Sequence, residues 1–285
     1  MKYIVKEDSE LLNYLYIIMK DVSKKKIKSL LKYKNIIVNN KEVTKFDYKL
    51  KKGDLIYIKE YKGHKVENNN IDIIYEDKDI IVVNKKSGLL TIATDKEKEI
   101  TLYRYVSDYV KMINKKNNIY IIHRLDKDTS GIVIFAKNEK IKKLYQDNWN
   151  DLVMVRSYIA IVEGNLEKKE DTIKSYLKEN KNNLVYSTKD KNGKIAITNY
   201  KVLKENSEYS MLQVIIETGR KNQIRVHMKD IKHPIIGDKK YGSKNNSINR
   251  LGLHANKLVV INPLMKKEMV FETNIPRKFK YLLKK

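Results

Sequence analysis

The first sixty residues show two successive patterns of hydrophobic positions. In residues 9–19, hydrophobic side chains recur at the three- and four-residue spacing of one helix face. Residues 23–35 repeat that spacing with lysines between the apolar positions, which predicts a second, basic helix. Shorter apolar runs at 36–44 and 54–61 predict two strands, with the turn between them at 51–54.

A polar stretch separates this first module, residues 1–62, from the rest of the chain. Residues 63–70 have no hydrophobic periodicity and are predicted to be a linker, which leaves residues 71–285 as a second, larger domain. Strand-like runs are found there at 71–77, 79–85, 119–123, 131–137, 155–164, 195–204, 209–218 and 253–261, and helical spacing at 101–113, 138–151 and 222–231. Because helices do not alternate regularly with strands, the fold class is predicted to be α+β rather than a doubly wound parallel sheet. No apolar run approaches eighteen residues, so no membrane-spanning helix is expected.

The charge balance narrows the class of partner. The chain has 60 Lys and Arg residues against 35 Asp and Glu, a formal net charge of +25. That excess favours a polyanion such as nucleic acid. The alternative is a bias in composition. Asn, Ile and Tyr are abundant as well as Lys, as AT-rich coding would produce, and such a bias would raise the number of lysines without any nucleic-acid partner. Arginine is scarce, so each Arg marks a candidate site for a planar, bidentate donor. Cysteine is absent, which excludes disulfides and thiol nucleophiles and fits a reducing cytoplasm.

The segment HRLDKDTSG, residues 123–131, lies between two apolar runs and has far more charged and hydroxyl side chains than a hairpin turn needs. It fits a polar turn with a packed histidine. It also fits a metal site made by Asp126 and Asp128, although no cluster of ligand residues accompanies them. In a third interpretation Asp126 is a nucleophile or general base at the end of a buried strand. That role needs a cation from elsewhere in the chain to keep the carboxylate ionised.

Two other segments carry candidate partners. In ETGRKNQIRVHMKDIKHPIIGDKKYG, residues 217–242, Arg225 falls near the start of a predicted helix, where it is expected to point into a cleft. The alternative is that Arg225 is one more surface cation. In RSYIAIVEG, residues 156–164, strand alternation places Tyr158 on the face opposite Ser157. By position alone such a tyrosine is more often a core or interface residue.

Taken together, these segments resemble the pseudouridine synthases of the large-subunit ribosomal A type (the RluA family). HRLDKDTSG matches that family's central motif at every defined position, and TGRKNQIRVH and RSYIAIVEG resemble its arginine- and tyrosine-containing motifs. GKIAITNYKVL, HPIIGDKKYG and RLGLHANKLVV resemble further family segments in the same order. The resemblance runs from about Ile71 to the C-terminus and implies a mixed, mainly antiparallel β-sheet. The two helices and hairpin before it resemble the small S4 RNA-binding domain that precedes many members.

The resemblance implies an RNA isomerase that detaches uridine from its ribose and reattaches it through carbon 5. Asp126 would be the essential residue, Arg225 its ion-pair partner, and Tyr158 the residue that stacks on the base and helps to deprotonate carbon 5. Arg124 matches an arginine that enters the RNA stem where the target base is extruded. Further RNA contacts are expected from His123, Arg220, Gln223 and Lys85.

Two positions depart from the family pattern. Lys86 stands where proline is usual, which should loosen a loop without stopping the chemistry. Asn222 stands where histidine is usual, and it keeps a hydrogen-bonding side chain that cannot titrate. Asn222 is therefore expected to have a structural role.

The resulting expectation is a pseudouridine synthase that acts on structured RNA, most simply large-subunit (23S) ribosomal RNA. Transfer RNA is the alternative substrate, and a non-catalytic RNA-binding or ribosome-assembly protein is the alternative class. A metal-dependent nuclease is a more distant third. No cofactor, metal, membrane or required protein partner is implied, and a cytoplasmic monomer is expected.

Overall fold

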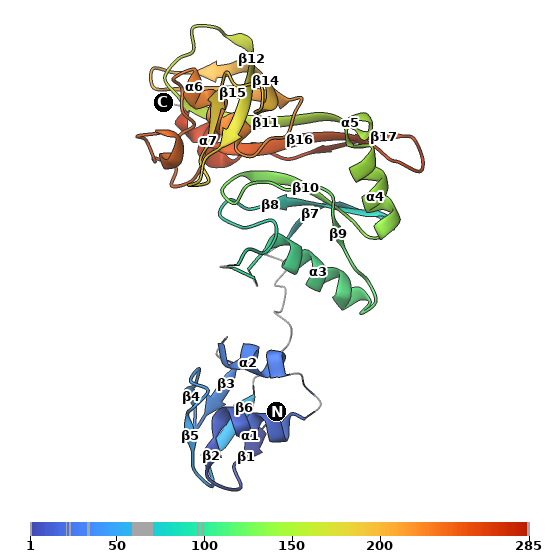
Figure 1. Cartoon of the computed structure of the whole chain (residues 1–285), viewed down its shortest axis with the longest axis vertical. Coiled ribbons are helices and arrows are strands. Elements are labelled where there is room, and N and C mark those ends of the chain that lie inside the picture. The colour runs from blue at the N-terminus through green and yellow to red at the C-terminus, as the bar shows by residue number, and fades with distance from the viewer. Residues whose placement is uncertain are drawn as a thin grey trace. The chain divides into compact units, whose positions relative to one another are not determined.

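The computed structural model describes residues 2–20, 22, 24–32, 35–58, 71–95, 97–98 and 100–283. It divides into two compact units, Met1–Glu67 and Asn68–Lys285, which are taken separately below (Figure 1). The predicted linker at 63–70 lies outside the described residues.

The first unit is a small antiparallel sheet with two helices. Its elements are β1 (Lys2–Ile4), β2 (Ser9–Glu10), α1 (Leu11–Ile18), α2 (Lys24–Lys32), β3 (Ile36–Val38), β4 (Lys41–Glu42), β5 (Lys49–Leu50) and β6 (Leu55–Ile58). Four of the strands form a sheet in the order β1-β6-β3-β4, and β2 pairs with β5. Both predicted helices are present. The run at 36–44, predicted as one strand, is instead a tight hairpin, because Asn39 and Asn40 both adopt positive φ angles between β3 and β4.

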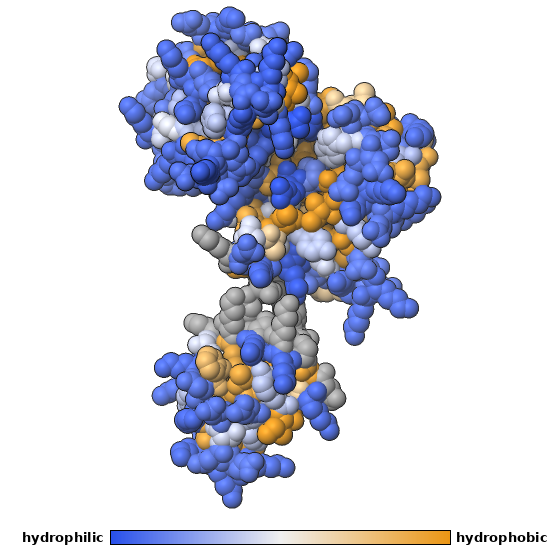
Figure 2. Space-filling model, viewed as in Figure 1, coloured by the Kyte–Doolittle hydropathy of each residue, from blue (hydrophilic) through white to orange (hydrophobic). Residues whose placement is uncertain are grey.

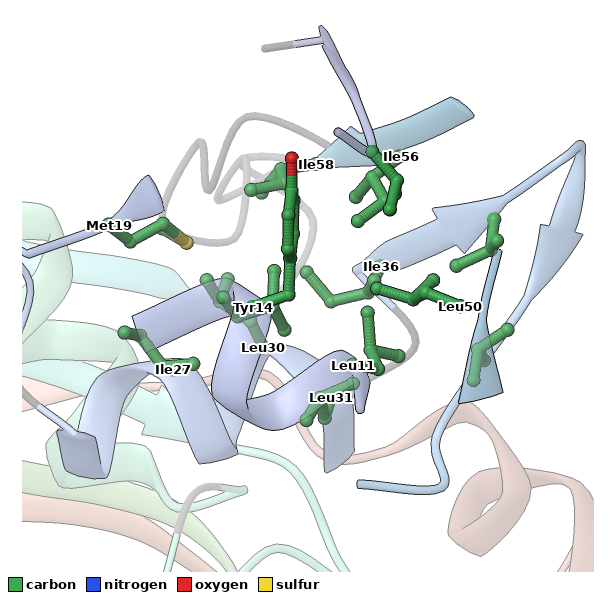
Figure 3. Packing of buried hydrophobic residues seen from close by; sticks show 14 residues of the cluster. Leu11, Tyr14, Met19, Ile27, Leu30, Leu31, Ile36, Leu50, Ile56 and Ile58 are labelled. Atoms are coloured by element: carbon green, nitrogen blue, oxygen red, sulfur yellow. The ribbon is translucent and has the colours of Figure 1, made fainter. Parts of the chain in front are cut away.

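The core of this unit lies between the helices and the strands. Figure 3 shows Leu11 and Tyr14 of α1 and Leu30 of α2 packed together with Ile36 and Ile56 from the strands. These residues are almost fully buried. The helical spacing in the sequence therefore marks the faces of α1 and α2 that meet the sheet.

The second unit is built on one large sheet. Its strands are β7 (Asp72–Glu76), β8 (Ile80–Lys85), β9 (Tyr120–Ile121), β10 (Ser130–Ala136), β11 (Val153–Glu163), β12 (Glu170–Glu179), β13 (Val185–Thr188), β14 (Lys194–Glu205), β15 (Tyr209–Ile216), β16 (Leu253–Ile261) and β17 (Glu268–Glu272). Its helices are α3 (Leu102–Ile113), α4 (Glu139–Asp147), α5 (Trp149–Leu152), α6 (Gln223–Asp230), the 3-10 helix η2 (Lys239–Tyr241) and α7 (Arg277–Leu282).

The strand order is β13-β12-β14-β15-β11-β16-β10-β8-β7, with β17 beside β16 and β9 beside β10. Every pair among these strands is antiparallel except β10 with β16. The predicted α+β class with a mixed, mainly antiparallel sheet is therefore confirmed. Strand β10 lies beside β16, and β16 lies beside the tyrosine strand β11 in the middle of the sheet, whereas helix α6 packs on β13 and β14 toward one end of it (Figure 1).

Several outer elements carry too little apolar signal to be predicted. Strands β12, β13 and β17 and helix α7 are missing from the prediction, and all but a few of their side chains are partly or fully exposed. The run at 119–123 was predicted as a longer strand, but only Tyr120–Ile121 pairs with β10. Figure 2 shows this unit as mainly hydrophilic, with hydrophobic residues gathered in the hollow between its two lobes. No helix in the described part of the chain is long and apolar enough to cross a membrane.

Candidate active site

A cleft of about 1060 Å³ lies where the HRLD segment, β11 and the start of α6 converge. Its lining includes Asp126, Tyr158 and Arg225, which come from three segments far apart in the sequence. Residues 90–94 and the turn at 217–222 complete the walls. The three residues predicted to carry the chemistry therefore line the same cavity.

Asp126 sits in a loop that is tied down along its backbone. The Thr91 hydroxyl donates to the Leu125 carbonyl (2.7 Å), and the Leu125 amide donates back to that hydroxyl (3.2 Å). The Gly88 amide donates to the Lys127 carbonyl at 3.0 Å. Residues on both sides of Asp126 are thus fixed by the segment that follows β8. The connection before β10 is therefore not a simple hairpin turn, and we call it the held loop.

Lys85 is the centre of this attachment. Its side chain is fully buried, and its ammonium group donates to the carbonyls of Lys86 (3.1 Å), Leu89 (2.6 Å) and Lys127 (2.8 Å). Burial lowers the pKa of Lys85 to about 7, against the attraction of Asp128 and Asp126. The prediction that Lys85 contacts RNA is corrected, because its three donors are used inside the protein and no part of it reaches solvent.

Burial and nearby cations have opposite effects on the pKa of Asp126. Burial raises the pKa of Asp126, while Arg225, Lys85 and Arg124 act to lower it. The carboxylate accepts no hydrogen bond from another side chain in the described part of the chain. An ionised, unpaired carboxylate facing a cavity has its lone pairs free for a ligand.

The partner of Arg225 differs from the prediction. Arg225 makes a two-point ion pair with Asp238, in which Nε and Nη2 donate to the two carboxylate oxygens at 2.7 Å each. Its Nη1 donates to the Asn222 side chain at 2.9 Å, and its guanidinium lies over the Tyr241 ring, 4.8 Å from the centroid. The predicted direct ion pair with Asp126 is not formed. Arg225 still acts on Asp126 through space, and it is Asp238 that fixes where its charge lies.

Asn222 has the structural role that was expected of it. It adopts a left-handed conformation with φ 55° at the N-terminus of α6, where its side chain accepts from Arg225 and donates to the Tyr241 hydroxyl at 3.2 Å. Asparagine tolerates this conformation better than most residues. Asn222 therefore gives Arg225 a hydrogen-bonded support.

Tyr158 reaches the cleft from β11. The strand alternates as predicted: Tyr158 packs with the core that includes Ala160 and Val214, while Ile159 belongs to the core on the opposite face. Burial raises the pKa of Tyr158 to about 12, so its hydroxyl is neutral at physiological pH. The negative charge of Asp126 adds to that rise in the pKa of Tyr158.

Two of the predicted RNA-contacting residues are engaged within the protein instead. His123 accepts a hydrogen bond from the Ile134 amide (3.1 Å), packs on Trp149, and has its pKa lowered to about 4 by burial and Arg156. Gln223 is almost fully buried. Its carbonyl accepts from the Thr218 hydroxyl and the Arg220 amide, and its amide donates to two acceptors on β14. Both side chains line the cleft, and the amide donors of Gln223 are used within the protein.

Arg124 and Arg220 are the predicted contacts that remain available. Both are exposed and line the cleft. Arg220 is steadied by one hydrogen bond from its Nε to the Ile195 carbonyl (2.9 Å). They leave guanidinium donors facing a cavity large enough for a nucleotide.

Arg156 and Asp238 were not predicted as site residues. Arg156 lies two positions before Tyr158, lines the same cleft, donates to the Glu217 carbonyl and lies 5.8 Å from the centroid of the Trp149 ring. Both residues lie in segments that the sequence analysis singled out, Arg156 in residues 156–164 and Asp238 in residues 217–242. The sequence could not predict which distant residue each of them contacts. Among the described residues, no three His, Asp or Glu side chains gather where they could hold a metal ion.

The comparison with known families agrees with this geometry. A family model for RNA pseudouridylate synthase matches residues 79–230, the stretch that contributes Asp126, Tyr158 and Arg225. The chain belongs to this family. It is accordingly an RNA isomerase of the pseudouridine synthase type.

Curated relatives match most of the chain. An uncharacterized RNA pseudouridine synthase of Bacillus subtilis, YhcT, is 31% identical over 266 residues, covering 91% of this chain and 88% of the relative. Ribosomal large subunit pseudouridine synthase D of Buchnera aphidicola is 32% identical and covers 96% and 93%. Its namesake in Borreliella burgdorferi is 37% identical over 201 residues, covering 68% and 62%. The structure of human RNA pseudouridylate synthase domain containing 4 has the same fold, with a TM-score of 0.62 at 23% identity over 75% of this chain and 92% of that one.

Proposed function

We propose that this pseudouridine synthase modifies specific uridines of large-subunit ribosomal RNA, with Asp126 as the catalytic carboxylate. The observation that carries the proposal is the position of Asp126: its carboxylate faces the cleft without a hydrogen-bonded partner, between the cations of Arg225 and Arg124 and the neutral phenol of Tyr158. The ribosomal substrate is supported by the relatives named large subunit pseudouridine synthase D.

The reaction breaks the bond between ribose C1′ and N1 of uracil, turns the base, and forms a bond from C1′ to C5. The proton on C5 must leave and N1 must gain one. In the proposal the ionised Asp126 acts on the ribose or the base, and Tyr158 stacks on the extruded uracil beside it. Burial raises the pKa of Asp126, and the surrounding cations act to lower it, so those cations favour the ionised form that the proposal uses.

Reaching the cleft requires the target base to leave its helix, at a cost of a few kcal/mol. Arg124 is exposed at the cleft beside Asp126, and a planar guanidinium can stack in the gap that the base leaves and contact phosphate. We assign the basic N-terminal unit, with its S4-like order of two helices and a small sheet, to RNA binding outside the cleft.

The test is a map of pseudouridine in ribosomal and transfer RNA from a host that lacks its own related synthases. The wild-type chain is expected to add a site in large-subunit RNA that Asp126→Asn does not add. The exposed substitution Asp147→Asn, at the end of α4, is the matched control and should add the same site. A new site only in transfer RNA would contradict the ribosomal assignment, and a site that persists with Asp126→Asn would contradict the catalytic one.

A further inference from the structure

A further cavity of about 620 Å³ is lined by both residues of the Arg225–Asp238 ion pair. Arg225 lines both cavities. Ser87, in the segment that follows β8, and Asp128 of the held loop form one part of its wall, and the segment from Gly237 to Leu251 forms most of the rest. We call this cavity the basic pocket, and its place next to the loop that carries Asp126 makes it part of the surface that an RNA on the cleft would cover.

Cations dominate the lining of the basic pocket. Beyond the Arg225–Asp238 pair, whose charges neutralise one another, it holds Lys239, Lys240, Lys278 and Arg250, against one carboxylate, Asp128. Such a local excess of positive charge in a concave site attracts an anion more strongly than the same charges spread over a flat surface.

Neutral groups hold three of these four cations in place. Lys240 donates to the Asn183 carbonyl (2.9 Å), Lys278 to the Ile248 carbonyl (3.0 Å), and Arg250 to the carbonyls of Leu251 and Leu253 and to the Ser130 hydroxyl. None of these acceptors carries a charge. The positive charge is therefore positioned without being cancelled.

Two lysines outside the basic pocket are paired differently. Lys168 pairs with Asp171, and Lys201 with Glu170, in exposed ion pairs with N–O distances of 2.8 and 3.0 Å. Those carboxylates offset the charge that the lysines present to a ligand. The contrast distinguishes the basic pocket from the general lysine richness of the chain.

We propose that the basic pocket binds a phosphodiester of the RNA strand that flanks the target uridine. The inference rests on the proposed function, since it takes the RNA in the catalytic cleft as the source of the phosphate. Phosphate contacts of this kind set the register of an RNA and carry no sequence information. The pocket would then hold the strand beside Asp126 while the uridine occupies the cleft.

The test measures RNA affinity against salt concentration for the full chain carrying Lys239→Gln and Lys278→Gln together. An in vitro transcript of large-subunit ribosomal RNA is the probe. Each lost phosphate contact should reduce the slope of log affinity against log salt by about 0.7 to 0.9. Affinity at physiological salt should fall, with a larger effect on KM than on kcat.

The matched control carries Lys168→Gln and Lys201→Gln, which removes the same charge from lysines paired with carboxylates, and its slope should change less. Lys239→Glu alone is a second variant, because Lys239 is exposed and its replacement removes no core contact. Equal slopes for pocket and control variants would overturn the proposal.

Two further results are distinguishable. If the pocket variants lose binding of inorganic phosphate or uridine monophosphate while the slope with RNA stays at the wild-type value, the pocket belongs to a free phosphate compound and the proposal fails. If no RNA gains pseudouridine, the proposed function fails. The slope of log affinity against log salt still tests whether the basic pocket binds RNA phosphate, because binding is measured without turnover.

Discussion

At the scale of single residues, buried polar groups position the loop of Asp126, the proposed catalytic carboxylate. Lys85 holds three carbonyls around the loop, and Asp238 with Asn222 holds Arg225. Such groups are costly to bury and are stable only when every donor finds an acceptor. The cleft therefore depends on residues that do not themselves face the substrate.

Replacing Lys85 by methionine tests this dependence. The carbonyls of Lys86, Leu89 and Lys127 would lose their shared donor, although the Lys127 carbonyl keeps the Gly88 amide. A buried acceptor that is left unsatisfied costs about 1–3 kcal/mol. Relief from burying the ammonium offsets part of that loss. We expect the free energy of unfolding to decrease by an amount within that range. The rate of pseudouridine formation should fall at least tenfold (about 1.4 kcal/mol), because Asp126 is no longer held.

Chemical denaturation and single-turnover assays give both quantities. Lys86→Met is the matched control: its side chain is exposed, and we expect near-wild-type stability and rate. Full activity in Lys85→Met would show that the loop keeps its geometry without this attachment.

At the scale of elements, the crossing of β10 beside β16 depends on one glycine. Gly131 pairs with Ala255 in the parallel contact of these strands and has φ +119°. A Cβ at this position would overlap the Ala255 backbone. Only glycine combines this conformation with so close an approach of two strands, which explains the Gly that ends the HRLDKDTSG segment.

Gly131→Ala should therefore lower the free energy of unfolding by about 2 kcal/mol or more, from backbone strain and overlap together. Gly88→Ala is the comparison, because Gly88 also has a positive φ, +83°, but a Cβ there meets nothing within 4 Å. Its cost should be limited to about 1–2 kcal/mol of strain. Equal midpoints of urea unfolding for the two variants would contradict the overlap at Gly131.

The strength of the apolar signal decided which elements could be predicted. Strands β8, β10, β11 and β15 lie in the sheet interior and have nearly continuous apolar runs. Strand β12 is mainly exposed, and its sequence, EDTIKSYLKE, mixes charges with hydrophobic residues. A strand that buries little needs little apolar surface, and it forms because its neighbours present a ladder to pair with.

At the scale of the whole molecule, the two units have separate cores. The buried residues of the first unit form a cluster that includes Leu11, Leu30 and Ile56, and residues of the second unit take no part in it. A unit with its own core can fold by itself. The larger unit contains all the residues of the catalytic cleft.

A chain that lacks residues 1–67 should therefore fold and unfold cooperatively while binding RNA more weakly than the full chain. Circular dichroism during heating tests the fold, and a filter-binding titration with ribosomal RNA tests affinity. We expect KM to rise at least tenfold, with kcat on bound RNA changed little. An insoluble remainder would contradict the independence of the larger unit, and unchanged affinity would contradict the assignment of the first unit to RNA binding.

The sequence by itself determined the fold class, the helices and strands of the core, and the family, because these follow from hydrophobic period and from the order of short motifs. It also identified Asp126, Tyr158 and Arg225 as candidates. Only the tertiary structure decided that Arg225 pairs with Asp238, that Lys85 and Gln223 are buried supports, and that Arg225 and Asp128 line the basic pocket. Alternation along a strand or helix gives the face of a side chain, whereas its partner depends on which distant segment the chain brings against that face.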